Sequence, residues 1–154
     1  MPALPPPPDP DFAARVRASF ARQGFMASLG AEMTVVEPGS CEIRLPYHAG
    51  LSQQHGYFHA GALTSIADSA GGYAAYTLMD ANDSVLAVEF KINLLAPGRG
   101  DAAVARACVV RSGRTLTVCQ IEVFVEQDGQ ETLCALMQQT VIRMAGRLDT
   151  AEDR

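Results

Sequence analysis

Apolar side chains between residues 60 and 79 follow the helical period. They recur at steps of three and four residues, at Leu63, Ile66, Ala67, Ala70, Ala74 and Leu78. That spacing lines one face of a helix, so a helix is predicted from Gly61 to about Met79. Its side chains are mostly small, which favours a helix enclosed by a sheet. Gly71 and Gly72 each cost about 1 kcal/mol relative to alanine in mid-helix, and we expect close packing to offset that loss.

The residues before this helix predict a short helix followed by a hairpin. Phe12, Val16 and Phe20 lie four residues apart, which gives residues 11–22 one apolar stripe. Residues 25–30 are interpreted as a connector. Strands are expected over residues 31–36 and 41–45, joined by a turn at Pro38 and Gly39.

The residues after the helix predict four strands. Val, Ile, Leu and Phe are frequent there, with polar residues between them. The expected strands cover residues 85–95, 101–111, 115–126 and 132–144. Turns of hairpin length join the last three, so an antiparallel sheet with one long helix packed on it is the economical fold of the α+β class.

Length and composition predict one domain. The chain has 154 residues, of which we assign 11–147 to the domain, 1–10 to a disordered proline-rich leader and 148–154 to a frayed tail. A net charge of -5 argues against nucleic-acid binding. Charges interrupt every apolar run, which argues against a membrane span. Without a secretory signal pattern, we expect a cytoplasmic protein with free thiols at Cys41, Cys108, Cys119 and Cys134.

The start of the long helix is a candidate for binding a polarised oxygen. The first backbone N–H groups of a helix, here those of Ala60 and Gly61, have no partner within the helix and carry the positive end of its dipole. They could bind a carbonyl oxygen. The alternative is that a side chain or a water molecule caps them.

Asp68 is an acid among small and apolar neighbours in the same helix. It lies too far along to serve as an N-terminal cap. If it is buried, its pKa rises, and the carboxylate could act as a general base or nucleophile near neutral pH. The alternative is a solvent-facing acid beside Thr64 and Gly72.

The histidines near the helix start could support a metal site only with further ligands. His55 and His59 are four residues apart, but Gly56 lies between them and they precede the predicted helix. No acidic or cysteine ligand accompanies them, so we expect no metal and no other cofactor. His59 is expected to support the turn by hydrogen bonding.

Together these residues resemble a known family. The residues that carry the resemblance are His59, Ala60, Gly61 and Asp68, followed by the segments VEFKINLLAPGRGD and RSGRTL. Over residues 31–141 the chain is similar to the hotdog-fold acyl-CoA thioesterases of the phenylacetate-pathway (PaaI-like) type. The resemblance implies a six-stranded antiparallel sheet wrapped around one long central helix. It also implies a homodimer, commonly a homotetramer, that hydrolyses thioesters at the interface between protomers.

The resemblance also implies roles for individual residues. Ala60 takes the position whose N–H polarises the thioester carbonyl, and His59 and Gly61 shape that turn. Asp68 takes the place of the nucleophile or general base. Gln53 stands where many members have an asparagine near the thioester.

Two departures from the family pattern bear on activity. Ala60 replaces the first glycine of an HGG motif, which requires a negative φ there. Ala87 replaces a serine or threonine on the third strand, which removes a hydroxyl that could hold water. An acyl-CoA-binding module without catalysis therefore stays open, whereas a hydratase lacks a second acid or histidine.

The CoA substrate carries phosphates that basic side chains would meet. Arg99, Arg111 and Arg114 are candidates because they lie at or beside turns, although each could be an ordinary surface charge. Tyr57, Phe58, Tyr73 and Tyr76 could line a pocket for an aromatic acyl group or simply belong to the core. The acyl group itself is not identified by the sequence.

Overall fold

A computed structural model describes residues 4–150 of the chain. Three α-helices, a short 3-10 helix and six strands make up this part. In chain order they are α1 (Phe12–Phe20), α2 (Gly24–Leu29), β1 (Glu32–Glu37), β2 (Ser40–Pro46), η1 (Ala49–Leu51), α3 (Ala60–Tyr76), β3 (Ser84–Leu94), β4 (Ala102–Ser112), β5 (Leu116–Gln127) and β6 (Gln130–Met144).

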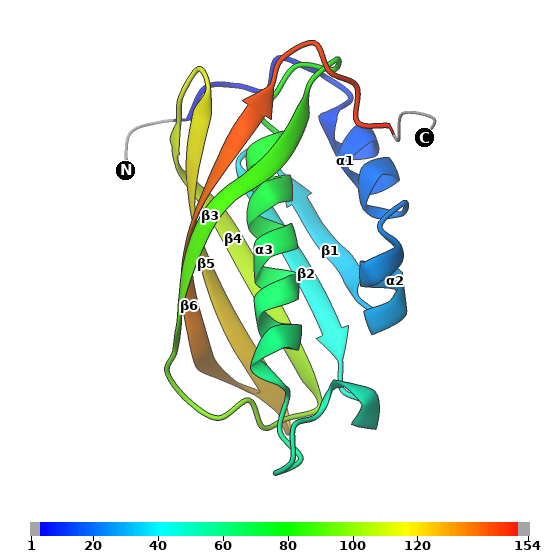
Figure 1. Cartoon of the computed structure of the whole chain (residues 1–154), viewed down its shortest axis with the longest axis vertical. Helices are drawn as coiled ribbons and strands as arrows, with labels where there is room; N and C mark the ends of the chain where they lie inside the picture. The colour runs from blue at the N-terminus through cyan, green and yellow to red at the C-terminus, as the bar shows by residue number, and fades with distance from the viewer. Residues whose placement is uncertain (1–3, 151–154) are drawn as a thin grey trace.

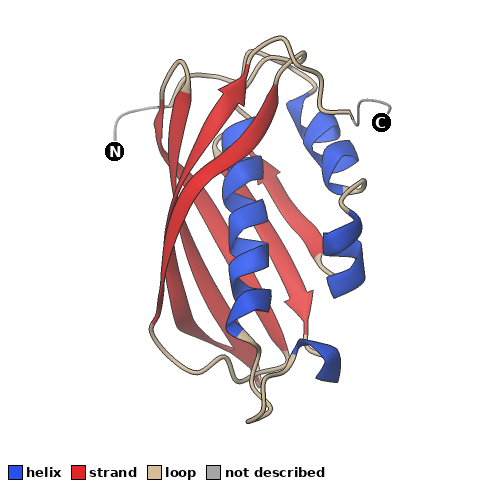
Figure 2. Ribbon diagram, in the orientation of Figure 1, coloured by secondary structure: helices blue, strands red, loops and turns tan. Residues whose placement is uncertain are grey.

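The strands form one antiparallel sheet curved around α3 (Figure 1). The strand order is β1-β2-β4-β5-β6-β3, so β3 crosses to the far edge beyond β6. Figure 2 shows α3 against the concave face, with α1 and α2 beside it on the β1 side. The expected six-stranded sheet around one long helix is confirmed.

The core lies between α3 and the sheet. Ile66, Ala67, Ala70 and Ala74 of α3 are fully buried, as the periodicity predicts. Helix-facing strand positions such as Ile43, Leu45, Ile121 and Val123 cover them. The small side chains of α3 thus let the sheet curve closely around the helix.

Two expectations about helices need correction. Residues 25–30, expected to be a connector, form most of α2, which Gly30 ends with a left-handed φ of 74°. The long helix begins one residue earlier than predicted and ends three residues earlier, at Tyr76. At this end the Thr77 hydroxyl donates to the Ala74 carbonyl and accepts the Gly39 N–H, at 2.7 Å in both cases.

The proline-rich segment contacts the domain, which differs from the expected disordered leader. Leu4 packs against the core beside Gly39. Asp9 is only 7% exposed, and its carboxylate accepts a 2.6 Å hydrogen bond from Nε of Arg15. Arg15 also donates to the Met79 carbonyl at 2.9 Å, which ties the segment to the end of α3. Residues 1–3 lie outside the described residues.

The tail expected to be frayed also makes a described contact. Asp149 accepts a hydrogen bond from Arg22, two residues after the end of α1, with an Nη2–Oδ2 distance of 2.9 Å. Residues 151–154 lie outside the described residues.

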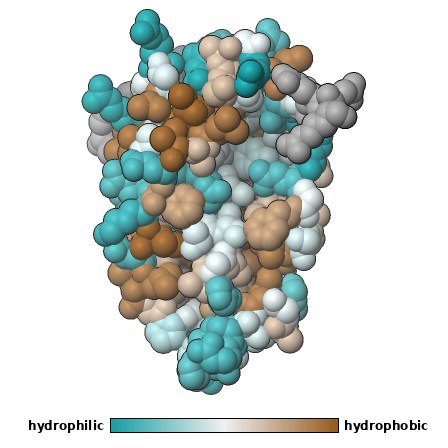
Figure 3. Space-filling view, in the orientation of Figure 1, coloured by the Kyte–Doolittle hydropathy of each residue, from teal (hydrophilic) through white to brown (hydrophobic). Residues whose placement is uncertain are grey.

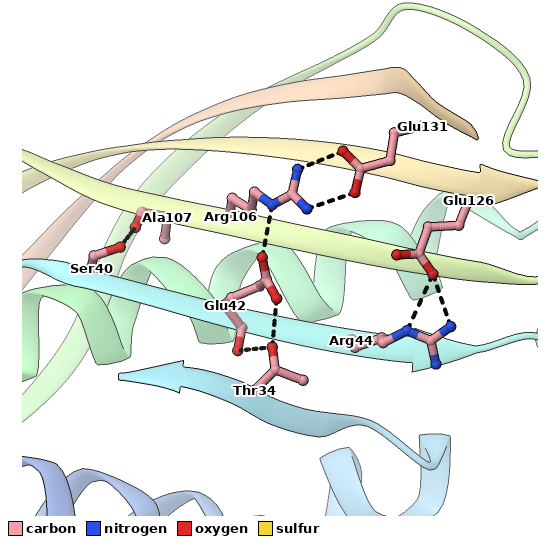
Figure 4. A network of polar contacts seen from close by, with 8 residues as sticks. All are labelled: Thr34, Ser40, Glu42, Arg44, Arg106, Ala107, Glu126 and Glu131. Carbon is pink, nitrogen blue, oxygen red and sulfur yellow. Dashed lines mark hydrogen bonds and ion pairs between the residues drawn. The ribbon is translucent and has the colours of Figure 1, made fainter. Parts of the chain in front are cut away.

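The outer face of the sheet carries paired charges (Figure 4). Arg106 of β4 donates to both carboxylate oxygens of Glu131 and to Glu42 of β2, at 2.6 to 2.7 Å. Arg44 and Glu126 form a second pair at 2.8 Å. These charges satisfy one another on the face turned away from α3.

The edge strand β3 exposes large apolar side chains. Leu86, Val88, Phe90 and Leu94 are 45 to 56% exposed. Phe90 and Leu94 pair in register with Gln139 and Ala135, which are buried on the helix-facing side. In Figure 3 apolar surface gathers where β3 crosses this view. The helix-facing side of β3 is thus only partly covered within one chain.

No helix between residues 4 and 150 is both long enough and apolar enough to cross a membrane.

Candidate active site

The loop before α3 is held in place by backbone hydrogen bonds. The His59 N–H donates to the Leu51 carbonyl and the Phe58 N–H to the Gly98 carbonyl, each at 2.8 Å. Gly98 belongs to the loop after β3. The start of α3 therefore rests on two loops that are far apart in the sequence.

The two backbone N–H groups that the sequence indicates as candidate donors, those of Ala60 and Gly61, differ in their hydrogen bonding. Nδ1 of His59 accepts the Gly61 N–H at 2.8 Å, so that amide is engaged. The Ala60 N–H has no hydrogen-bond acceptor within residues 4–150. The only residue with positive φ, apart from glycines, in this part of the chain is Asp128, so Ala60 has the negative φ that an alanine requires. His59 supports the turn as expected, and Ala60 supplies the available donor.

The residue that carries this free amide lines a largely apolar groove. The groove has a volume of about 590 Å³ and includes Ala60, Tyr57, Phe58, Leu63 and Leu95 in its lining. Where apolar side chains displace water around an N–H group at a helix start, that group binds an oxygen with partial negative charge more strongly than it would in bulk water.

Gln53 also lines the groove. Its side-chain oxygen accepts the His55 N–H, while its backbone N–H donates to the Tyr57 carbonyl at 2.9 Å. The side-chain carbonyl is therefore engaged within the loop, and the amide nitrogen is the atom of Gln53 left for a ligand.

Asp68 lies in a second, smaller pocket of about 130 Å³. The side chain is half-buried, and Gln139 of β6 donates to its Oδ1 at 2.5 Å. Burial raises the pKa of the Asp68 carboxyl, because the charged form loses solvation, and the Gln139 hydrogen bond opposes that rise. Asp68 thus combines partial burial with an opening toward solvent, in a pocket that Gly72 also lines.

The two halves of the predicted site are apart in a single chain. Asp68 follows Ala60 by eight residues, which is about 12 Å along a helix axis. No residue is shared between the linings of the groove and of the smaller pocket. A carbonyl bound at the Ala60 N–H is therefore out of reach of Asp68 in the same chain.

The three candidate arginines are all exposed and occupy both ends of the molecule. Arg99 follows Gly98 beside the groove. Arg111 and Arg114 flank the β4–β5 turn, which lies near Leu78 after the end of α3. Of the three, only Arg99 is adjacent in sequence to a residue of the groove lining.

The predicted aromatic residues also separate. Tyr57 and Phe58 line the groove, and Tyr73 lines the pocket beside Asp68. Tyr76 is 2% exposed beneath the Arg15 guanidinium, 4.1 Å from its ring centre, so it belongs to the core. Among residues 4–150, no cluster of three His, Cys, Asp or Glu residues could hold a metal ion.

Gln139 was missed in the sequence. It occupies a helix-facing position in β6, two residues from the buried Met137 and Val141. A polar residue that interrupts an inward-facing apolar row is the signal that could have found it. Its partner could not have been found in this way, because Asp68 lies 71 residues earlier.

Comparisons with known proteins agree with this geometry. Residues 55–132 match the family model described as Thioesterase superfamily. A protein of Halobacterium salinarum, named as a presumed esterase, is 30% identical over 77% of this chain and 81% of its own length.

Two solved structures are similar over most of both chains. A thioesterase family protein from Silicibacter pomeroyi superposes with a TM-score of 0.85 at 46% identity, over 86% of this chain and 98% of that one. The E. coli PaaI protein from the phenylacetic acid degradation operon gives a TM-score of 0.78 at 25% identity, over 90% and 96%. This chain therefore belongs to the thioesterase superfamily and has its hotdog fold.

Proposed function

We propose that the protein hydrolyses acyl-CoA thioesters at two sites in a homodimer. Each site combines the Ala60 N–H of one protomer with the Asp68 carboxylate of the partner. The observation that carries the proposal is that the Ala60 N–H has no acceptor among the described residues and that Ala60 lines a largely apolar groove.

The proposed reaction begins with binding of the thioester carbonyl at the helix start. The carbonyl oxygen accepts the Ala60 N–H, and the helix dipole stabilises the negative charge that develops on this oxygen. The Gly61 N–H already donates to Nδ1 of His59, so the role of Gly61 is to form the cap at the start of α3. The CoA phosphates meet basic side chains, of which Arg99 lies nearest to the groove.

Asp68 supplies or activates the oxygen that attacks. As a general base it takes a proton from water, and as a nucleophile it attacks the carbonyl carbon itself. The raised pKa supports both roles, since it makes the carboxylate a stronger base than an exposed aspartate. In the first route the carbon–sulfur bond breaks after water adds to the carbonyl, and CoA leaves as the thiol with the proton that Asp68 took from water. In the second route the carbon–sulfur bond breaks as Asp68 forms a mixed anhydride with the acyl group, and the CoA thiolate takes up a proton from solvent. Water then hydrolyses the anhydride, which releases the free acid and restores the Asp68 carboxylate.

The exposed apolar side chains of β3 support the dimer. An edge strand with Val88, Phe90 and Leu94 open to solvent is an aggregation hazard unless another chain covers it. A second copy at this edge would add its own α3 beside the first. That arrangement supports a site to which Asp68 and Ala60 come from different protomers; a homotetramer would be built from two such dimers.

The decisive experiment measures thiol release from a panel of acyl-CoA esters with the wild type and Ala60→Pro. Proline removes the N–H but suits the first position of a helix. His59 already has φ -64° and ψ 137°, a conformation that a residue preceding proline readily adopts.

We expect Ala60→Pro to lower kcat by about 100-fold, the cost of losing an oxyanion donor. Ala60→Gly, which keeps the N–H, should remain active. A wild type that binds acyl-CoA but releases no thiol would instead indicate a binding module. Equal activity in Ala60→Pro would remove the amide from the mechanism.

A further inference from the structure

Gln139 holds both the side chain and the backbone of Asp68. Its Nε2 donates to Oδ1 of the carboxylate at 2.5 Å and to the Asp68 carbonyl oxygen at 3.1 Å. The Gln139 side chain is only 1% exposed. This amide therefore joins β6 to the middle of α3 at the residue that the proposed function uses as base or nucleophile.

The helix is shaped to receive this amide. A Cβ built at Gly71 would overlap Oε1 of Gln139 and would also lie 2.9 Å from Cδ1 of Ile121. At the neighbouring Gly72, a Cβ would meet nothing within 4 Å. The close packing expected of the two glycines thus holds at Gly71, where the missing side chain makes room for Gln139.

The side-chain amide of Gln139 makes only part of its possible hydrogen bonds with the protein interior. Oε1 of Gln139 is buried and has no hydrogen-bond partner among the described residues. A buried acceptor left unpaired destabilises the fold, and an apolar side chain of similar size would remove that penalty. Core packing alone therefore does not account for a glutamine here.

Other polar groups around the pocket are engaged elsewhere. The Ser19 and Tyr73 hydroxyls bond to each other at 3.1 Å, and the Ser69 hydroxyl donates to Gln23 at 3.3 Å. Within residues 4–150, Gln139 is the only side chain that donates to the Asp68 carboxylate, and Oδ2 receives no hydrogen bond.

We infer that Gln139 is a positioning residue, which fixes the Asp68 carboxylate through Oδ1 and leaves Oδ2 directed to the reaction. This inference rests on the proposed function. A neutral amide suits the role, because it orients the carboxylate without the strong stabilisation of the charged form that a lysine or arginine would bring.

The inference implies a direction for the titration of Asp68. Burial raises the pKa of Asp68 and the Gln139 hydrogen bond lowers it, so losing the amide moves the pKa further up. The other titratable groups lining the pocket are Tyr73 and Asp149. Burial raises the pKa of Tyr73 to about 12, and Asp149 forms an ion pair with Arg22 at 2.9 Å. Asp68 is the carboxyl in this pocket whose pKa depends directly on the Gln139 amide.

The test compares Gln139→Met with Gln138→Met. Methionine fills a similar volume without a donor. Gln138 is exposed on the opposite face of the same strand, so it controls for the substitution itself. In Gln139→Met we expect kcat to fall roughly 10- to 100-fold, with KM within about twofold and the acidic limb of the pH–rate profile shifted to higher pH. Gln138→Met should match the wild type.

A double-mutant cycle asks whether Gln139 acts through Asp68. In an Asp68→Asn background, Gln139→Met should change kcat by less than about twofold, because the carboxylate it orients is gone. A full, independent loss in this background would overturn the inference, as would an unchanged kcat and pH profile in Gln139→Met alone. Gln139→Asn has a side chain one methylene too short to reach Asp68, so it should behave like Gln139→Met. It replaces Gln139→Met in these tests if the methionine variant does not fold.

A titration separates this inference from the proposed function. The ¹³C resonance of the Asp68 carboxyl, assigned by its absence in Asp68→Asn, reports the pKa without turnover. A titration shifted to higher pH in Gln139→Met, but not in Gln138→Met, supports the contact between Gln139 and Asp68. This holds even if the wild type hydrolyses no thioester, because the absence of hydrolysis would reject only the proposed function. An unchanged titration would overturn the inference whatever the activity.

Discussion

At the scale of single residues, Asp68 combines partial burial with one amide donor. The Asp68→Asn substitution keeps the volume and removes the charge, so we expect turnover to drop by about 100-fold or more. Thiol release under saturating substrate measures this loss. Binding should survive, because the Ala60 amide and the groove are unchanged.

The same variant separates catalysis from stability. The folded pKa of Asp68 is raised, so its contribution to stability is present below its unfolded pKa of about 4 and is lost as the pH rises through the folded value. Asp68→Asn should therefore unfold at the same temperature as the wild type, or higher, at pH 7. Normal turnover per folded molecule, with a changed melting temperature, would make Asp68 a structural residue.

At the scale of elements, the ion pair between Asp9 of the leader and Arg15 of α1 makes a different prediction from the sequence. The Asp9 and Arg15 side chains are 7% and 15% exposed, and breaking such a pair leaves a buried charge alone. We expect Asp9→Asn, and deletion of residues 1–10, to lower the free energy of unfolding by about 3 kcal/mol at pH 7. Asp11→Asn, at an exposed acid two residues away, is the matched control.

The pH dependence of this effect has a definite sign. The hydrogen bond from Arg15 lowers the pKa of Asp9, so its stabilisation is present above the unfolded pKa and disappears as the pH falls through the lower, folded value. The difference between wild type and Asp9→Asn, measured by denaturant unfolding, should shrink below about pH 4. A difference independent of pH would point to packing instead of the ion pair.

At the scale of the whole molecule, the proposed site combines Ala60 of one chain with Asp68 of another, because about 12 Å of helix separates the two residues within a chain. A heterodimer of Ala60→Pro and Asp68→Asn subunits, isolated through two different tags, should contain one doubly altered site and one intact site. We therefore expect about half of the wild-type activity per dimer, whereas each variant alone is nearly inactive. No recovery in the heterodimer would place both groups of a site in one chain.

Elements with a strong local pattern of apolar residues are predictable from the sequence, whereas short elements without one are not. The helical spacing of Ile66, Ala67, Ala70 and Ala74 can be recognised within a short stretch of sequence, and all four are buried as expected. The six strands were also located to within about two residues. In contrast, Phe25, Met26 and Leu29 form too short a run to show a helical period, so the sequence predicts a connector where α2 lies.

The sequence by itself determined that one small-residue helix lies on an antiparallel sheet, and that Asp68 is an acid among apolar neighbours. These features follow from local periodicity, because each residue's neighbours in the chain decide which face of an element is apolar. Only the tertiary structure decided that β3 joins the sheet beyond β6, that His59 caps Gly61 and leaves Ala60 free, and that Gln139 meets Asp68. Strand order and the contact between Gln139 and Asp68 depend on the packing of segments far apart in the sequence, and the choice of amide depends on a side-chain geometry that a local pattern does not encode.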